Sequence, residues 1–136
     1  MEKQKYAAIV LAAGSGKRMN SKVHKQYLII QDRPVLYYSL KAFEDSAVDE
    51  IVLVVGKGEE KFCRKEIVDK YGISKVKAIV EGGKERYHSV FEGLKQTSDA
   101  DYVLIHDGAR PFVNQEIIRR CMLEVPEYQA CVVGMP

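Results

Sequence analysis

Short apolar runs recur along the chain and alternate with longer amphipathic segments. The first run begins at Tyr6 and ends at Leu11, directly before a glycine-rich turn. Four more runs, rich in β-branched residues, cover 48–55, 75–80, 100–105 and 129–133. Continuous apolar runs bounded by glycine or polar turns are typical of strands buried on both faces of a parallel sheet. We therefore predict a strand at each run.

Helical spacing of apolar residues marks the segments between these strands. The segments are 35–43, 59–71, 85–96 and 114–123. Gly72 follows the second in a C-terminal capping position, and Asn114 caps the fourth. In the third, Val90, Phe91 and Leu94 share one face, which predicts a helix. Strands alternating with helices predict right-handed βαβ units, and so a Rossmann-like, mainly parallel sheet with helices on both faces.

Composition places the chain among ordinary globular proteins. It has 136 residues, of which 46% are hydrophobic and 29% charged, so we expect a single domain over 1–136. The formal net charge is only +2. Nothing global therefore indicates nucleic acid or an anionic membrane as a partner, and any anion site must be local.

The cysteines and the apolar runs bear on the compartment. Cys63, Cys121 and Cys131 have no metal-ligand spacing, and their odd number argues against a disulfide framework, so we expect reduced thiols. No apolar stretch approaches the roughly 20 residues of a membrane span. We therefore expect a soluble cytoplasmic protein.

The turn after the first strand is the leading functional candidate. Gly14 and Gly16 let the backbone approach a ligand and point N–H groups at phosphate oxygens, and Arg18 can hold two oxygens at once. The alternative is an ordinary turn with solvated basic residues. A P-loop is excluded because Arg18 stands where Ser or Thr is needed, and Met19 breaks the dinucleotide fingerprint. A loop that uses cations directly suits a triphosphate.

Two other strand ends carry unusual residues. Gly83 follows the third strand in a turn against which a flat base could lie, with Ser89 as a hydrogen-bonding partner, although paired glycines are often only a turn. Asp107 follows the fourth strand, where it could bind magnesium or cap the next turn. We assign His106 to structure. Because ligands bind outside the carboxyl ends of parallel strands, these ends should converge with the first turn.

Three motifs in register resemble one known family. They are LAAGSGKRM (11–19) with KQY (25–27), VEGGKERYHSV (80–90) and HDGARPF (106–112). This set resembles the 2-C-methyl-D-erythritol 4-phosphate cytidylyltransferase family of the non-mevalonate isoprenoid pathway. The resemblance implies a nucleotidyltransferase fold and an attack of the acceptor's phosphate on the α-phosphorus of CTP, with pyrophosphate leaving and Mg²⁺ bridging the triphosphate. It also implies a homodimer for full-length members.

The resemblance also implies roles for single residues. Arg18 and Lys25 would stabilise charge on the α-phosphate, and Asp107 would bind the metal. The implied nucleotide-binding residues are Ala12, Ala13, Gly14, Gly16, Gly83, Ser89, Gly108 and Arg110. Lys84 and Gly108 depart from the usual pattern, which has alanine at the latter position. Family members continue beyond the position of Pro136, so we expect a C-terminally truncated domain that keeps part of the CTP site and has little turnover.

Three other functions stay open. Ribitol-5-phosphate cytidylyltransferases share the fold, the nucleotide and the first loop, but tend to carry serine and valine in the motif that here reads HDGARP. Sugar-nucleotide pyrophosphorylases usually place a proline before the lysine, where this chain has His24 before Lys25. A non-catalytic nucleotide-binding module would not need Arg18, Lys25 and Asp107 together.

Overall fold

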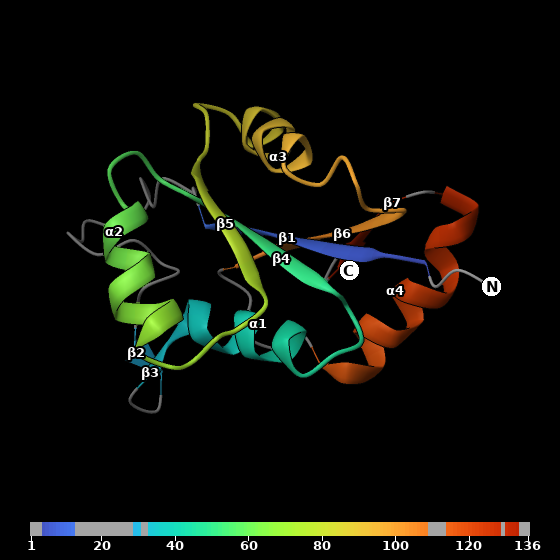
Figure 1. Ribbon diagram of the computed structural model, residues 1–136, viewed down its shortest axis with the longest axis horizontal. Helices are drawn as coiled ribbons and strands as arrows, with labels where there is room; N and C mark the ends of the chain where they lie inside the picture. The colour runs from blue at the N-terminus through green and yellow to red at the C-terminus, as the bar shows by residue number, and fades with distance from the viewer. Residues whose placement is uncertain (1–3, 13–28, 31–32, 109–113, 129, 134–136) are drawn as a thin grey trace.

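A five-stranded parallel sheet forms the centre of the computed structural model, which describes residues 4–12, 29–30, 33–108, 114–128 and 130–133 (Figure 1). The strand order is β5-β4-β1-β6-β7. The strands are β1 (Tyr6–Ala12), β4 (Glu50–Val55), β5 (Val76–Glu81), β6 (Tyr102–Asp107) and β7 (Ala130–Val133). Each predicted strand is confirmed. The antiparallel pair of β2 (Ile29–Ile30) and β3 (Arg33–Pro34) was not predicted.

Helices cover both faces of this sheet, as predicted. They are α1 (Val35–Glu44), α2 (Glu60–Cys63) with the π-helical η2 (Arg64–Asp69), α3 (Arg86–Lys95) and α4 (Gln115–Tyr128). Figure 1 shows α1, α2 and α4 below the sheet and α3 above it. Right-handed crossovers between parallel strands place successive helices in this way. The fold class is therefore the Rossmann-like α/β class.

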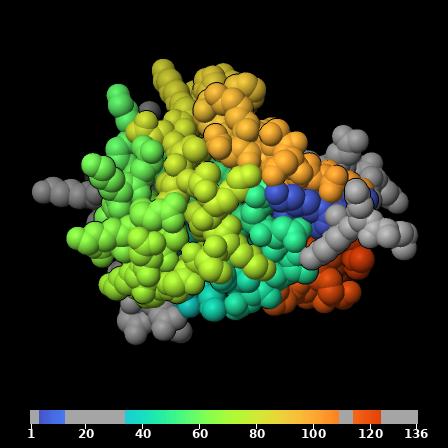
Figure 2. All heavy atoms as spheres, viewed as in Figure 1, coloured from blue at the N-terminus to red at the C-terminus, as the bar shows by residue number. Residues whose placement is uncertain are grey.

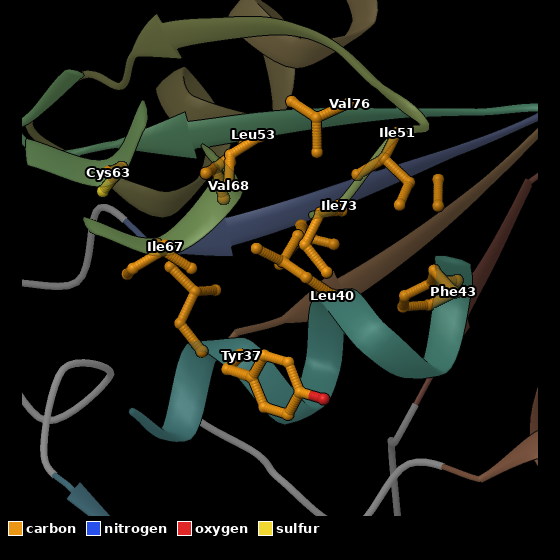
Figure 3. Packing of buried hydrophobic residues seen from close by; sticks show 14 of the residues in the cluster. Tyr37, Leu40, Phe43, Ile51, Leu53, Cys63, Ile67, Val68, Ile73 and Val76 are labelled. Atoms are coloured by element: carbon orange, nitrogen blue, oxygen red, sulfur yellow. The ribbon is translucent and has the colours of Figure 1, made fainter. Parts of the chain in front are cut away.

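The larger core lies between the sheet and the lower helices. In Figure 3, Leu40 and Phe43 of α1 and Ile67 of η2 point toward Ile51 and Leu53 of β4. All five side chains are fully buried. Leu40 and Phe43 are three residues apart on α1, a spacing that puts two side chains on one face of a helix. This core fixes α1 against the strands whose carboxyl ends carry the candidate site.

The upper helix, which was predicted, packs on the sheet through Ser89, Val90 and Gly93. Ser89 and Gly93 of α3 are buried, while Phe91 is 59% exposed and Leu94 is 41% exposed. A Cβ added at Gly93 would lie 2.7 Å from Cγ2 of Ile9. The glycine thus lets the helix backbone come close to β1, and the wider side chains remain on the outer surface. The yellow-to-orange atoms of this region form the top of the molecule in Figure 2.

Several element boundaries also differ from the sequence pattern. β6 continues through His106 and Asp107, two residues further than predicted. α4 continues to Tyr128. The predicted caps are confirmed: Gly72 has a φ of +67°, and the amide of Ile117 donates to Oδ1 of Asn114 at 2.9 Å. The strand ends that carry the predicted site residues therefore lie at the carboxyl edge of the sheet.

The expectation of reduced thiols is wrong for one cysteine. Cys121 on α4 is disulfide-bonded, whereas Cys63 is buried as a thiol. An odd number of cysteines argues against a framework of several bridges, but it does not prevent a single bridge. Within the described residues, no helix combines the length and the apolar character needed to cross a membrane.

Candidate functional site at the carboxyl edge of the sheet

The ends of neighbouring strands lie side by side at one edge of the sheet. Leu11 of β1 is the register partner of Asp107 in β6. On the other side of β1, Ala12 pairs with Val55, and Val55 pairs with Glu81 at the end of β5. The ends of β1, β5 and β6 therefore meet at the same edge, as predicted. In open parallel sheets this edge is where ligands bind.

The turn after β6 is anchored to two other elements. The amide of Gly108 donates to the carbonyl oxygen of Leu11 at 2.8 Å, and the Ser39 hydroxyl on α1 lies 3.5 Å from the carbonyl oxygen of Gly108. The space around Gly108 is also tight, because an added Cβ would lie 2.8 Å from Cδ1 of Leu36. The peptide that follows Asp107 is thus held between β1 and α1.

His106 has the structural role that we assigned to it. Its side chain is fully buried, and Nε2 lies 3.1 Å from Oγ of Ser39. Its ring packs against Phe43, with the ring centroids 5.7 Å apart. Buried polar side chains are normally hydrogen-bonded, since an unmet hydrogen bond in the interior is costly. The pair of Ser39 and His106 is a feature that sequence reasoning missed.

Asp107 faces the opposite side of the sheet from His106. Leu104 belongs to the core under α1, and Ile105 belongs to the core under α3. Because side chains alternate along a strand, Asp107 lies on the side of α3. It is partly buried at the last position of β6. The buried Ser89 also faces the sheet from that side, so the predicted metal and base contacts share one face.

Gly83 is required for the packing of the turn before α3. A Cβ at this position would lie 2.2 Å from Cβ of His88. His88 in turn caps α3: its Nδ1 accepts a hydrogen bond from the amide of Glu85 at 3.3 Å, and the two residues form a capping box. The amide of Gly82 donates to the carbonyl oxygen of Val55 at 2.7 Å, so this turn is also tied to the sheet.

Five of the predicted site residues are described by the structure. Ala12 ends β1 and is buried; Asp107 ends the neighbouring strand β6, and Gly108 follows it. Gly83 lies in the turn before α3, and Ser89 lies near the start of that helix. The remaining predictions fall outside the described residues; they are Ala13, Gly14, Gly16, Arg18, Lys25 and Arg110.

The donor set fits a metal ion that arrives with its substrate. Among the described residues, no group of three or more His, Cys, Asp or Glu side chains could hold a metal. Two other carboxylates near this edge bind backbone amides: Glu81 accepts from Gly58 at 2.7 Å, and Glu59 accepts from Gly56 at 3.0 Å. Mg²⁺ commonly binds one or two carboxylates and completes its shell with phosphate oxygens and water. A single carboxylate at the end of β6, such as Asp107, is compatible with that requirement.

The amino edge of the sheet carries a separate ionic cluster. Lys77 contacts Glu50 at 3.0 Å, and Lys5 contacts Asp99 at 2.5 Å and Glu50 at 3.5 Å. Glu50 is nearly buried, and its Oε1 has no hydrogen bond among the described residues. These carboxylates are balanced by lysines and lie at the opposite ends of the strands from Asp107. They stabilise the sheet rather than extend the candidate site.

Comparisons with known proteins show which family the chain resembles. A family model described as 2-C-methyl-D-erythritol 4-phosphate cytidylyltransferase matches residues 6–136. A curated protein of that name from Lachnoclostridium phytofermentans is 54% identical over 132 residues, which are 97% of this chain and 57% of the relative. One from Alkaliphilus metalliredigens is 45% identical over 134 residues, covering 97% of this chain and 56% of the relative. The chain thus spans a little over half of the relatives' length.

A solved structure gives the same picture. The crystal structure of 4-diphosphocytidyl-2C-methyl-D-erythritol synthase from Anaerococcus prevotii superimposes with a TM-score of 0.74 at 32% identity. The match covers 90% of this chain and 51% of that chain. The bifunctional protein IspDF from Campylobacter jejuni matches with a TM-score of 0.73 at 26% identity, covering 91% of this chain and 31% of that one.

Proposed function

Since this chain belongs to the 2-C-methyl-D-erythritol 4-phosphate cytidylyltransferase family, we propose that it transfers a cytidylyl group from CTP to 2-C-methyl-D-erythritol 4-phosphate and releases pyrophosphate. The observation that carries the proposal is the pairing of Leu11 with Asp107, which sets a carboxylate beside the turn that follows β1. A triphosphate bound by that turn would lie at the same edge of the sheet as Asp107, the proposed metal-binding residue.

The reaction itself needs little covalent chemistry from the protein. A phosphate oxygen of the acceptor attacks the α-phosphorus of CTP and forms a new P–O bond. The bond from the α-phosphorus to the oxygen that bridges to the β-phosphorus breaks, and pyrophosphate leaves with those electrons. Catalysis of such a transfer is positioning together with stabilisation of the charge on the phosphate oxygens. No nucleophilic side chain is required.

We assign the charge stabilisation to Arg18 and Lys25. A guanidinium can hold two oxygens of the α-phosphate, and a lysine adds a compact charge. The backbone of the first turn would bind the nucleotide through its N–H groups. Gly83 and Ser89 would contact the cytosine, with Gly108 and Arg110 lining the pocket. The residues assigned to the first turn are Ala12, Ala13, Gly14 and Gly16.

Asp107 would hold Mg²⁺ together with the phosphates of CTP. When bound, the ion neutralises charge on the triphosphate and orients it. The contribution of the chain is the position of the carboxylate, which the hydrogen bonds of Gly108 restrain. We further infer that the enzyme works in the cytoplasm, where its phosphorylated substrates are soluble, and that the complete family length forms a homodimer.

Calorimetric titration tests this proposal. CTP, UTP and CDP are added to the 136-residue chain with and without Mg²⁺. We expect CTP to bind most tightly and to require the metal. Binding that is indifferent to the base, or unchanged by removal of Mg²⁺, would point to a general nucleotide-binding module instead. Pyrophosphate release with methylerythritol phosphate and with ribitol 5-phosphate then identifies the acceptor, and a higher rate with the latter would reassign the activity.

A further inference from the structure

We propose that Ser39 and His106 are positioning residues that hold Asp107 in place for metal binding. Neither residue belongs to the set implied by the family motifs for substrate or metal contact. Both are fully buried, and they connect the middle of α1 to the end of β6. The inference rests on the proposed function, because it concerns the same metal-binding carboxylate.

A short chain of hydrogen bonds reaches the peptide after Asp107. Nε2 of His106 lies 3.1 Å from Oγ of Ser39, and the same Oγ lies 3.5 Å from the carbonyl oxygen of Gly108. The amide of Gly108 is bound at 2.8 Å to the carbonyl oxygen of Leu11. Both polar backbone atoms of Gly108 are therefore tied to neighbouring elements, one to β1 and the other to α1.

Which group donates in each of these hydrogen bonds follows from the single hydroxyl proton of Ser39. When the hydroxyl donates to the carbonyl of Gly108, its oxygen can only accept from His106. Nε2 of His106 must then carry a proton and donate. The imidazole thus orients the hydroxyl, and the hydroxyl restrains the carbonyl. Without the Nε2–H donor of His106, nothing orients the Ser39 hydroxyl toward Gly108, and its restraint on the carbonyl weakens.

This arrangement restrains Asp107 from both directions along the backbone. The residue before it is fixed by burial against Phe43, and the residue after it is fixed by two hydrogen bonds. Metal and phosphate sites are sensitive to displacements of about 1 Å. A purely structural role for the pair predicts lower stability only. A positioning role predicts faster amide exchange at Gly108 and an altered Mg²⁺ dependence of CTP binding. Both effects should exceed what the loss of global stability would cause.

Amide hydrogen exchange measured by NMR tests the clamp without any ligand. The variants are Ser39→Ala and His106→Leu, with His106→Gln as the conservative variant that restores a donor. Ser46→Ala is the matched control, since the Ser46 hydroxyl binds the carbonyl oxygen of Phe43 at 2.7 Å near the end of the same helix. The amide of Gly82, bound to the carbonyl oxygen of Val55, is the internal reference.

We expect Ser39→Ala and His106→Leu to speed exchange of the Gly108 amide about tenfold relative to Gly82. The amide keeps its bond to Leu11, but loss of the hydrogen bond to the Gly108 carbonyl lowers the cost of opening this turn by roughly that factor. His106→Gln should restore most of the protection, and Ser46→Ala should leave the ratio unchanged. Equal acceleration at both glycines, or no acceleration, would overturn the clamp. A variant that loses its native spectrum is replaced by Ser39→Cys, which keeps the volume and weakens the hydrogen bonds.

Titration of CTP against increasing Mg²⁺ then tests the consequence. Ser39→Ala should raise the Mg²⁺ concentration needed for half-maximal CTP binding about tenfold, a factor in the range found for residues that orient metal ligands. In an Asp107→Asn background it should have no further effect. If the unsubstituted chain fails to bind CTP with Mg²⁺, the proposed function fails, and the exchange ratios alone decide on the clamp. If it binds and Ser39→Ala keeps the same Mg²⁺ dependence, the positioning role is wrong.

Discussion

The amide of Gly108 donates to the carbonyl oxygen of Leu11 at 2.8 Å, one residue past the end of β6. The turn after β5 repeats this relationship, because the amide of Gly82 donates to the carbonyl oxygen of Val55 at 2.7 Å. Both turns at the candidate site are thus extensions of the parallel hydrogen-bond pattern rather than independent loops. Their positions are therefore set by hydrogen bonds to the sheet.

Asp107→Asn should remove the effect of Mg²⁺ on CTP binding. The amide keeps the shape of the side chain but loses the negative charge, so we expect CTP affinity in the presence of Mg²⁺ to fall about tenfold or more. Calorimetry with and without the metal measures the change. Glu81→Gln is the matched control at the same edge, because Glu81 already binds the amide of Gly58. An equal loss in both variants would mean a general charge effect instead of a metal ligand.

Gly83→Ala should destabilise the start of α3. The new Cβ would lie 2.2 Å from Cβ of His88, and neither atom can rotate away, so we expect a loss of about 1–3 kcal/mol in the free energy of unfolding. Gly56→Ala is the control, since its Cβ would meet the far end of the Glu59 side chain at 2.4 Å, which can turn away at the cost of its hydrogen bond to the amide of residue 56. Urea unfolding compares the two. A smaller loss at Gly83 than at Gly56 would contradict the packing described here.

Two phenylalanines should respond very differently to truncation. Phe43 is fully buried under the sheet, so Phe43→Ala should cost about 3–5 kcal/mol of unfolding free energy. Phe91 is 59% exposed on α3, so Phe91→Ala should change stability by less than about 0.5 kcal/mol. Chemical unfolding of both variants measures the difference. A large cost at Phe91 would mean that this face of α3 is covered in solution.

Glu44 should make the stability of the fold depend on acid. Burial acts to raise the pKa of its carboxyl group, but hydrogen bonds from the Ser74 hydroxyl and the amides of Lys75 and Ser74 outweigh it, so the pKa lies below the ordinary 4.5. A lowered pKa in the folded state stabilises the protein above the unfolded-state pKa, and that stability is lost as the pH falls through the folded-state pKa.

Glu44→Gln should therefore be less stable than the original chain at pH 7, with a difference that shrinks below about pH 4.5. Urea unfolding at several pH values measures this difference. Glu92→Gln serves as the control, because Glu92 forms only a surface pair with Lys95 at 3.0 Å. A difference for Glu44→Gln that does not vary with pH would contradict the assigned cause.

Much of the fold follows from local patterns in the sequence. The apolar run that becomes β1 and the glycine at 72 are signals that a single stretch of sequence carries. The buried side of α3 was not predictable in this way. Of its apolar residues, Val90 packs against the sheet while Phe91 and Leu94 are exposed, and Gly93 permits a closer approach to Ile9 than any larger side chain would. The side of α3 that contacts the sheet is determined by tertiary packing, and a short stretch of sequence carries no information on that packing.

In the candidate site, too, some residues could be found from the sequence and others only from the structure. Asp107 stood out as a carboxylate at a strand end, and the register with Leu11 confirms its place at the edge. Ser39 gave no signal, since a serine within a helix is commonplace. Its importance depends on the distance to His106, which lies 67 positions away in the sequence. Contacts of that range become visible only in the folded structure.

The location of the metal–nucleotide complex tests the central claim most directly. Mn²⁺ with CTP replaces Mg²⁺, and the loss of amide signals through paramagnetic broadening is recorded by NMR for the whole chain. We predict the strongest broadening at Ala12, Asp107 and Gly108, with the signals of Lys5 and Glu50 at the amino edge retained. Broadening centred on Lys5 and Glu50 instead would contradict a cytidylyl-transfer site at the carboxyl edge of the sheet.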